Sequence, residues 1–373
     1  MSKNNGMINE LPMLDIPSIK DMVKHLVLKL NKVLFVRGTF GAGKSEGIHQ
    51  VVAELDNRKA MIALLGPDTP YRGVMMVDVR LGGYESVDLR GFPGVDKTTG
   101  QTVWFAPSTL PIVGNDQYPD DKLILLFLDE ATSIKDDGVM SCAYQITLDR
   151  GVGEHKLKPN VRIVLAGNLD DDNGIVNTIP MPLNNRMTHV QAVVSPEAVV
   201  QHMQTRGVPP IFQAFLLACK DLVHTYDPRK PTAIVATPRT IMEAVDIYND
   251  DMPDELKQAA IEGTVGTGWA KQFQGFHDVW RRVPSIKDII ADPMGIRLPE
   301  GSDALSLTYA TVIKVTGAMA LKNMTPLYKF ITRLDAEYVV LCMTMATSRD
   351  AALFGTPEFM DYTKRYRDVY SRT

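Results

Sequence analysis

The sequence predicts an α/β fold, a three-layer sandwich around a parallel five-stranded sheet, followed by a region built only of helices. Short, continuous apolar runs that end in polar or glycine-rich turns predict the sheet. Beyond about residue 196 the hydrophobic periodicity becomes helical, with proline and glycine at the boundaries. We therefore expect an N-terminal tail over 1–20, the sheet domain over 21–196, helices over 197–300 and a C-terminal helical extension over 301–373.

Composition sets outer limits on function. The chain has 373 residues, which is more than one hydrophobic core usually serves. A net charge of -4 gives no bulk attraction for nucleic acid or an acidic membrane, although it does not exclude a local basic patch. No apolar run approaches a membrane span and the polar start resembles no secretion signal, so a cytoplasmic protein is expected. The three cysteines lie far apart and suggest neither a disulfide framework nor a metal site.

The first strand of the expected sheet, in KVLFV, runs into a glycine-rich turn that SEGIHQVVAEL follows as a helix. The turn fits the pattern G-x-x-x-x-G-K-[ST] through Gly38, Thr39, Phe40, Gly41, Ala42, Gly43, Lys44 and Ser45. In such a P-loop, backbone N–H groups and the helix N-terminus face a phosphate chain. Lys44 would reach the β- and γ-phosphates, and the Ser45 hydroxyl would bind Mg²⁺. The turn therefore predicts an ATP·Mg²⁺ site, and the alternative is a glycine-rich turn that binds nothing.

A second apolar run, Leu123 to Leu128 in KLILLFLDEATS, has the continuous hydrophobicity of a central parallel strand. It ends in Asp129 and Glu130, at the edge where parallel sheets place their ligands. We expect Asp129 to hold the Mg²⁺ shell and Glu130 to polarise the attacking water. The alternative is that both acids only cap a following helix.

A third run, Val161 to Ala166 in NVRIVLAGN, reads as another buried strand and leads to Asn168. An amide at this strand end could orient the same water as Glu130. Asn at a strand end is also a common turn former, so this signal alone is weak.

The order P-loop, Asp-Glu strand and Asn strand resembles the AAA+ class of P-loop NTPases, over roughly residues 30–300. Within that class the chain is similar to the MoxR-like group. The second helix of that group, with its insert, is similar to VMMVDVRLGGYESVDLRGFPGVDKTTGQTVWFAPS, and the stretch between the acids and the asparagine is similar to LDEATSIKDDGVMSCAYQITLDRGVGEHKLKPNVRIVLAGN. The arginine-finger segment is similar to PMPLNNRMTHV, and the lid helix is similar to ATPRTIMEAVDIY.

The resemblance implies roles for two arginines. Arg186 would be an arginine finger that stabilises charge on the γ-phosphate of a neighbouring subunit, which requires a head-to-tail homo-oligomeric ring, in this family a hexamer. Arg239, after Pro238 and with Thr237 as a possible helix N-cap, would sense the γ-phosphate from an α-helical lid over 197–300, in its own or a neighbouring subunit. The alternatives are a surface arginine paired with a carboxylate and an ordinary first-turn arginine.

Two inserts accompany the expected sheet. Turn residues before the strand-like QTVWF predict a β-hairpin near 91–108 that interrupts the second helix, whose aromatic Phe92 could touch a substrate. We expect Trp104 and Phe105 instead to anchor the hairpin on its own domain. A second turn, DRGVGEHKLKPN, predicts another hairpin, with Lys158 among the basic residues of a small solvated tip.

Together these features predict an ATP hydrolase of the AAA+ class, with ATP and Mg²⁺ as cofactors, that remodels a partner protein. The MoxR-like resemblance implies a chaperone-like role and a partner that carries a von Willebrand factor A domain. The alternatives are a motor stimulated by nucleic acid and a structural subunit that uses ATP only for assembly.

Overall fold

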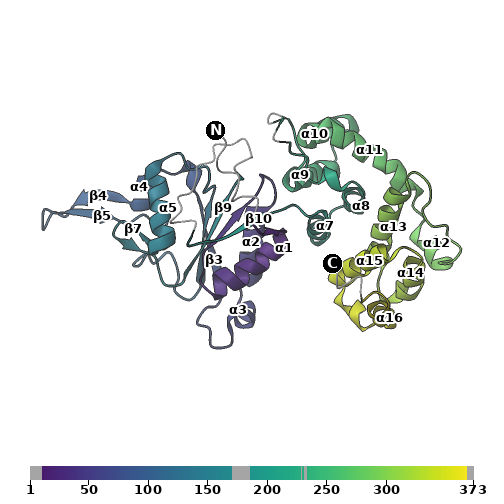
Figure 1. The fold of residues 1–373 in the computed structure, drawn as a ribbon, viewed down its shortest axis with the longest axis horizontal. Coiled ribbons are helices and arrows are strands. Elements are labelled where there is room, and N and C mark those ends of the chain that lie inside the picture. The colour runs from purple at the N-terminus through teal and green to yellow at the C-terminus, as the bar shows by residue number, and fades with distance from the viewer. Residues whose placement is uncertain (1–10, 170–184, 228, 231–232, 368–373) are drawn as a thin grey trace. The chain divides into compact units, whose positions relative to one another are not determined.

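The computed structural model describes residues 11–169, 185–227, 229–230 and 233–367. The chain divides into two compact units, Met1–Val194 and Ser195–Thr373 (Figure 1). No helix in the described part of the chain combines the length and the hydrophobicity that crossing a membrane needs.

The first unit is built on a parallel sheet of six strands, which confirms the predicted α/β fold with one strand more than expected. Their order across the sheet is β1 (Met13–Leu14), β10 (Thr188–Ala192), β2 (Leu34–Arg37), β9 (Val161–Gly167), β6 (Leu123–Asp129) and β3 (Val74–Arg80). The additional strand β1 pairs with the end of β10, so the predicted tail over 1–20 is wrong for this stretch. Two residues are too short for a periodic pattern, which is why the sequence did not reveal β1.

Helices cover both faces of this sheet, as the three-layer prediction requires. They are α1 (Ile16–Met22), the π-helix η2 (Val23–Lys29), α2 (Lys44–Leu55), α3 (Arg58–Leu65), the 3₁₀-helix η3 (Leu81–Gly83), α4 (Ser86–Arg90) and α5 (Asp137–Asp149). Strand β6 shows the layering, because Leu125 and Phe127 pack with α1, η2 and α2 while Leu126 and Leu128 pack with α5. The strand is buried on both sides, which explains its unbroken apolar run.

The antiparallel hairpin of β4 (Phe92–Val95) and β5 (Thr102–Phe105) occupies the first insert. It follows the five-residue helix α4 and leads into turns over residues 106–122. The expectation that the hairpin interrupts a longer helix is therefore wrong. Phe92 and Phe105 lie opposite each other and are 60% and 63% exposed. The expectation that Phe105 anchors the hairpin on its own domain is therefore wrong, since its ring instead covers Gly94 of the partner strand.

The second, smaller hairpin joins β7 (Gly151–Val152) to β8 (His155–Lys156). The sequence suggested that Lys158 belongs to a solvated tip, and the structure contradicts this. Lys158 is buried, and its Nζ donates to the carbonyl of Tyr118 and to Asp120 Oδ1, at 2.5 and 3.1 Å. A buried ammonium needs such acceptors, and these lie some forty residues away in the sequence.

The described residues of the second unit form helices and the loops that join them. The helices are α7 (Pro196–Thr205), α8 (Pro210–Ala218), η4 (Lys220–Leu222), α9 (Pro238–Asn249), α10 (Asp254–Val265), α11 (Thr267–Arg282), α12 (Ile286–Ala291), α13 (Ala304–Ala318), η5 (Leu321–Asn323), α14 (Met324–Ile331), α15 (Ala336–Arg349), η6 (Ala351–Gly355) and α16 (Pro357–Arg365). Helix α8 ends at Ala218, and the short 3₁₀-helix η4 follows it. Helices α10 and α11 are separated at Gly266, whose φ of 88° interrupts the helical backbone. Helix α13 packs on both α8 and α15, and the division into lid and extension stays a prediction.

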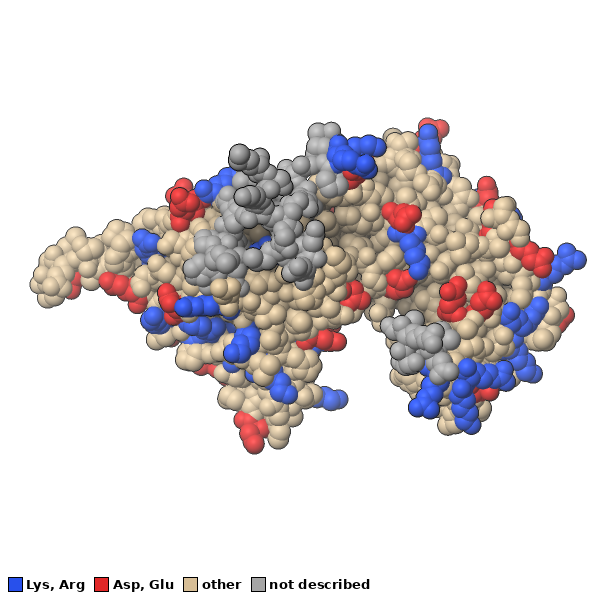
Figure 2. All heavy atoms as spheres, viewed as in Figure 1, with Lys and Arg blue, Asp and Glu red and all other residues tan. Residues whose placement is uncertain are grey.

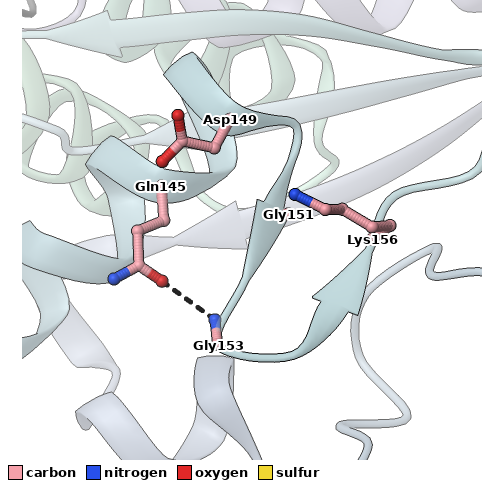
Figure 3. A pocket seen from close by; sticks show the side chains of 5 residues that line it. All are labelled: Gln145, Asp149, Gly151, Gly153 and Lys156. Atoms are coloured by element: carbon pink, nitrogen blue, oxygen red, sulfur yellow. Dashed lines mark hydrogen bonds between the residues drawn. The ribbon is translucent and has the colours of Figure 1, made fainter.

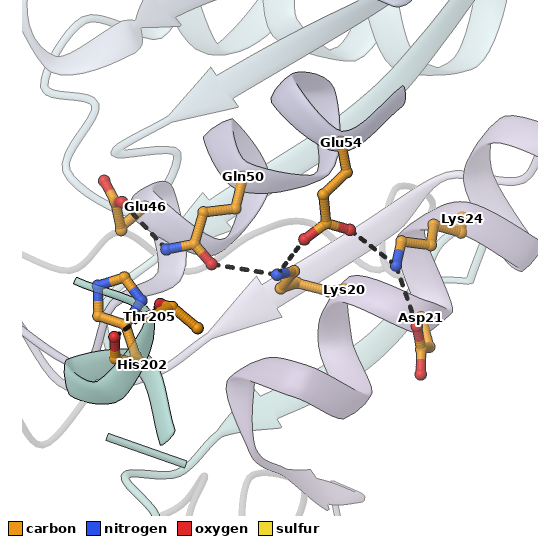
Figure 4. Close-up of polar contacts among 8 residues, drawn as sticks. All are labelled: Lys20, Asp21, Lys24, Glu46, Gln50, Glu54, His202 and Thr205. Atoms are coloured by element: carbon orange, nitrogen blue, oxygen red, sulfur yellow. Dashed lines mark hydrogen bonds and ion pairs between the residues drawn. The ribbon is translucent and has the colours of Figure 1, made fainter. Parts of the chain in front are cut away.

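A polar network ties the N-terminal helices to α2 (Figure 4). Lys20 of α1 and Lys24 of η2 both contact the carboxylate of Glu54, at 2.6 and 3.0 Å, and Lys20 also donates to Gln50. Burial opposes the charged form of Glu54, but the two lysines outweigh it and hold the pKa of this carboxyl below its usual value. The network therefore braces the helix that begins at the glycine-rich turn.

We expect Glu54→Gln to lower the free energy of unfolding at pH 7 by about 1 kcal/mol or less, because the pairs are partly exposed. Since the folded-state pKa of Glu54 is depressed, the contribution is present above its unfolded value near 4.5 and is lost as pH falls through the folded value. Urea unfolding of both proteins at pH 7 and at acidic pH measures this difference. A difference that persists unchanged in acid would contradict the assignment.

Candidate active site

The glycine-rich turn between β2 and α2 adopts a conformation that its glycines make possible. Gly41 and Gly43 have φ values of 71° and 90°, in the left-handed region that side chains disfavour. At Gly38 a Cβ atom would lie 2.9 Å from the Cβ atom of Ala192, so a larger residue would push the loop away from β10. Helix α2 begins directly at Lys44, and its N-terminus therefore faces the turn.

The side chain of Lys44 folds back over the loop. Its Nζ donates to the carbonyls of Gly38 and Thr39 at 2.6 and 2.9 Å, and it lies 3.4 Å from Asn168 Oδ1. Only 8% of Lys44 is exposed. A buried ammonium beside a helix N-terminus makes this a strong candidate anion site.

Ser45 and Asp129 meet across the gap between α2 and β6. The Ser45 hydroxyl donates to Asp129 Oδ2 at 2.8 Å. Two neighbouring ligands of an octahedral Mg²⁺ with bonds near 2.05 Å stand about 2.9 Å apart, so this oxygen pair fits the ion. Since no cluster of three or more His, Cys, Asp or Glu occurs among the described residues, such an ion would complete its shell with phosphate oxygens and water.

Glu130 follows in an unusual backbone conformation. Its φ is 57°, and its N–H donates to Asp129 Oδ1 at 2.8 Å. Glu130 is exposed, and its Oε2 lies 2.7 Å from the position that a Cβ of Gly82 would take. The turn thus directs the two neighbouring acids differently, Asp129 toward Ser45 and Glu130 past the end of β3. Gly82 is a part of the site that the sequence analysis missed.

Asn168 stands between the loop and the acids, because β9 lies between β2 and β6 in the sheet. Its backbone N–H donates to the hydroxyl of Thr132 at 2.8 Å. Thr132, which is 1% exposed, was not predicted from the sequence. The only sequence signal would have been a polar residue two positions after the acid pair, and threonine there is unremarkable in a turn.

The two predicted arginines belong to other elements of the chain. Arg186 is exposed, in the turn before β10, and most of the PMPLNN stretch that precedes it lies outside the described residues. Arg239 is exposed in the first turn of α9, in the second unit, where Thr237 caps the helix as expected. The sequence-predicted residues from the loop, Asp129, Glu130 and Asn168 are therefore brought together within the first unit.

A separate hollow lies between the end of α5 and the β7–β8 hairpin (Figure 3). It is lined by Gln145, Asp149, Gly151, Gly153 and Lys156. Gln145 Oε1 accepts a hydrogen bond from the Gly153 N–H at 2.9 Å, which holds the hairpin turn on the helix. The hollow shares no residue with the candidate active site.

Comparison with known proteins gives distant structural similarity only. No protein-family model matches the chain, and no curated protein matches it in sequence. Similar solved structures include NtrX from Brucella abortus (13% identity, 88% of this chain, 67% of that chain, TM-score 0.37) and a putative ATPase from Cytophaga hutchinsonii (11%, 89%, 79%, 0.32). PCH-2 of C. elegans is a third (14%, 69%, 65%, 0.31). Similarity at this level identifies neither a family nor an activity.

We expect Lys44→Ala to abolish ATP binding, or to weaken it at least about tenfold, because it removes the ammonium that faces the loop. Fluorescence anisotropy with a labelled ATP analogue measures the affinity. Lys59→Ala, at an exposed position of helix α3, is the matched control and should bind as the unmodified chain does. Equal affinity of Lys44→Ala and the unmodified chain would exclude the loop as the nucleotide site.

Proposed function

We propose that the chain is a Mg²⁺-dependent ATP hydrolase of the AAA+ class. The observation that carries this proposal is the convergence of three strand ends: Lys44 and Ser45 after β2, Asp129 and Glu130 at the end of β6, and Asn168 after β9. An ammonium, an oxygen pair suited to Mg²⁺, a second carboxylate and an amide are the groups that transfer of a phosphoryl group to water needs.

Each residue has a distinct part in the proposed reaction. The loop N–H groups and Lys44 bind and orient the phosphates, while Ser45 and Asp129 would hold Mg²⁺, which neutralises charge on the phosphate oxygens when it is bound. Glu130, exposed beside the cluster, accepts a proton from the attacking water. Asn168 orients that water from the neighbouring strand end.

We propose further that Arg186 completes the site of another copy of the chain. Because β10 runs parallel to β2 and Thr188 pairs with Leu34, Arg186 lies at the amino edge of the sheet. Its own P-loop lies at the opposite edge, beyond the four residues of β2, or about 13 Å of strand. A finger placed this way reaches the active site of a neighbouring subunit more readily than the site of its own subunit. This supports a closed head-to-tail ring such as a hexamer.

The biological task that we propose is the remodelling of a partner protein, in the manner of the MoxR-like group. The β4–β5 hairpin supports this, because its strands carry no charged residue and expose Phe92, Val95 and Phe105. Exposed apolar groups of this kind suit contact with another protein. By the same resemblance the partner would carry a von Willebrand factor A domain, and Arg239 would sense nucleotide from the lid.

A motor stimulated by nucleic acid is the second candidate. Figure 2 shows Lys and Arg gathered at the C-terminal helices, and α14 and α16 carry Lys329, Lys364 and Arg365 in their last turns. Arg365 is already paired with Asp361, and acidic groups lie among the basic ones on these helices. The charge distribution therefore favours this function less than the first.

We expect Glu130→Gln to lower kcat for ATP hydrolysis at least about a hundredfold while ATP still binds, because it removes the proton acceptor but leaves the phosphate contacts. Release of inorganic phosphate and binding of labelled ATP measure the two effects. Glu300→Gln, at an exposed loop position of the second unit, is the control and should change neither.

Unchanged hydrolysis by Glu130→Gln would disprove the assignment of the base, and no hydrolysis by the unmodified chain would disprove the proposed activity. A rate that rises on addition of DNA and falls with salt would favour the nucleic-acid motor.

We expect Arg186→Ala to lower kcat about a thousandfold, since an inserted guanidinium contributes about 10³–10⁵ to such reactions. Mixing Arg186→Ala with Lys44→Ala should restore part of the rate, because a site shared by the two variants has an intact loop from one and a finger from the other. Arg206→Ala, at an exposed position after α7, is the control. A chain that stays monomeric with saturating ATP and hydrolyses it at full rate would contradict the shared site.

A further inference from the structure

One buried hydroxyl next to the candidate active site has no role in the mechanism so far. Thr132 lies two residues beyond Glu130, and its side chain is 1% exposed. Its Oγ1 accepts the backbone N–H of Asn168 at 2.8 Å. This N–H follows the last residue of β9, so it lies just past the sheet ladder and depends on a side chain for its acceptor.

The contact between Thr132 and the end of β9 is close on its apolar side as well. Thr132 Cγ2 and Oγ1 lie 2.6 and 2.8 Å from the position that a Cβ of Gly167 would occupy. One residue before Thr132, the N–H of Ala131 donates to the carbonyl of Ala166 at 2.8 Å. The turn that carries the acid pair is therefore fixed to residues 166–168 by two hydrogen bonds and a contact that only glycine allows.

The same short stretch is bound on its other side to the phosphate loop. The N–H of Gly38 donates to the carbonyl of Gly167 at 3.2 Å, and Lys44 Nζ lies 3.4 Å from Asn168 Oδ1. Residues 167 and 168 thus connect the acid turn to the loop, and Thr132 fixes the backbone from which the Asn168 amide projects. A shift of that backbone would move the amide relative to Lys44 and to the water that Glu130 activates.

From this geometry we propose that Thr132 is a positioning residue for ATP hydrolysis, which acts through Asn168 by accepting its backbone N–H. This inference rests on the proposed function. The hydroxyl of Thr132 bonds to the Asn168 backbone and not to the phosphate loop or the ammonium, so we expect it to serve turnover rather than nucleotide affinity. The hydroxyl is the essential group, because a valine would fill the same space against Gly167 but leave the partly buried N–H of Asn168 without this acceptor.

The experiment compares three variants in steady-state ATP hydrolysis. Thr132→Val should lower kcat at least about fivefold with KM for ATP within about twofold of the unmodified chain, because the misplaced amide affects the reaction more than binding. Thr132→Ser keeps the acceptor and should recover most of the rate. Thr147→Val removes another buried hydroxyl, one that donates to the Ala143 carbonyl within α5, and should leave kcat unchanged.

A double-mutant cycle separates positioning from general stability. If Thr132 acts through Asn168, Thr132→Val should lower kcat by less than about twofold once Asn168 is alanine. Equal effects in both backgrounds, or a normal kcat for Thr132→Val, would overturn the inference while hydrolysis by the unmodified chain keeps the proposed function intact. An inactive unmodified chain would overturn the proposed function, and this inference with it.

Discussion

The pairing of β9 with both β2 and β6 is the constraint on which the candidate active site depends. Each functional group sits within two residues of a strand end or at the first residues of the helix that follows, so its place is set by the register of the sheet. Arg37 pairs with Gly167, and Leu128 pairs with Leu165, which brings the three strand ends to one edge. A slip of one residue in β9 would turn every apolar side chain of that strand to the other face. The packing of the core therefore determines the positions of the site residues, as the conformation of the loop also does.

The sequence predicted this part of the molecule well because its signals are local. Six consecutive apolar residues before Asp129 can be buried only between two layers, and the glycine spacing before Lys44 is specific to one kind of turn. The fold class and the residues that meet at the sheet edge could thus be predicted from short stretches. Their proposed roles come from chemistry and resemblance rather than from that geometry.

What the sequence could not predict depends on contacts between distant residues. Lys158 is buried because acceptors near residue 120 surround its ammonium, and β1 forms because β10 offers an open edge. Phe105 is exposed on the β4–β5 hairpin, which projects from the rest of the first unit (Figure 1), and hydrophobicity alone does not reveal such a projection. Thr132 was missed for the same reason, since its partner lies 36 residues further along the chain.

The hydrogen bonds from Lys44 to the carbonyls of Gly38 and Thr39 have an energetic consequence for whatever the loop binds. The ammonium has already given up most of its hydration and is held in the folded loop. An arriving phosphate therefore replaces two backbone acceptors instead of stripping water from a free cation, so the main desolvation cost was met when the chain folded. The affinity of the loop for a phosphate is then the difference between the hydrogen bonds that the phosphate offers to the ammonium and those of these two carbonyls.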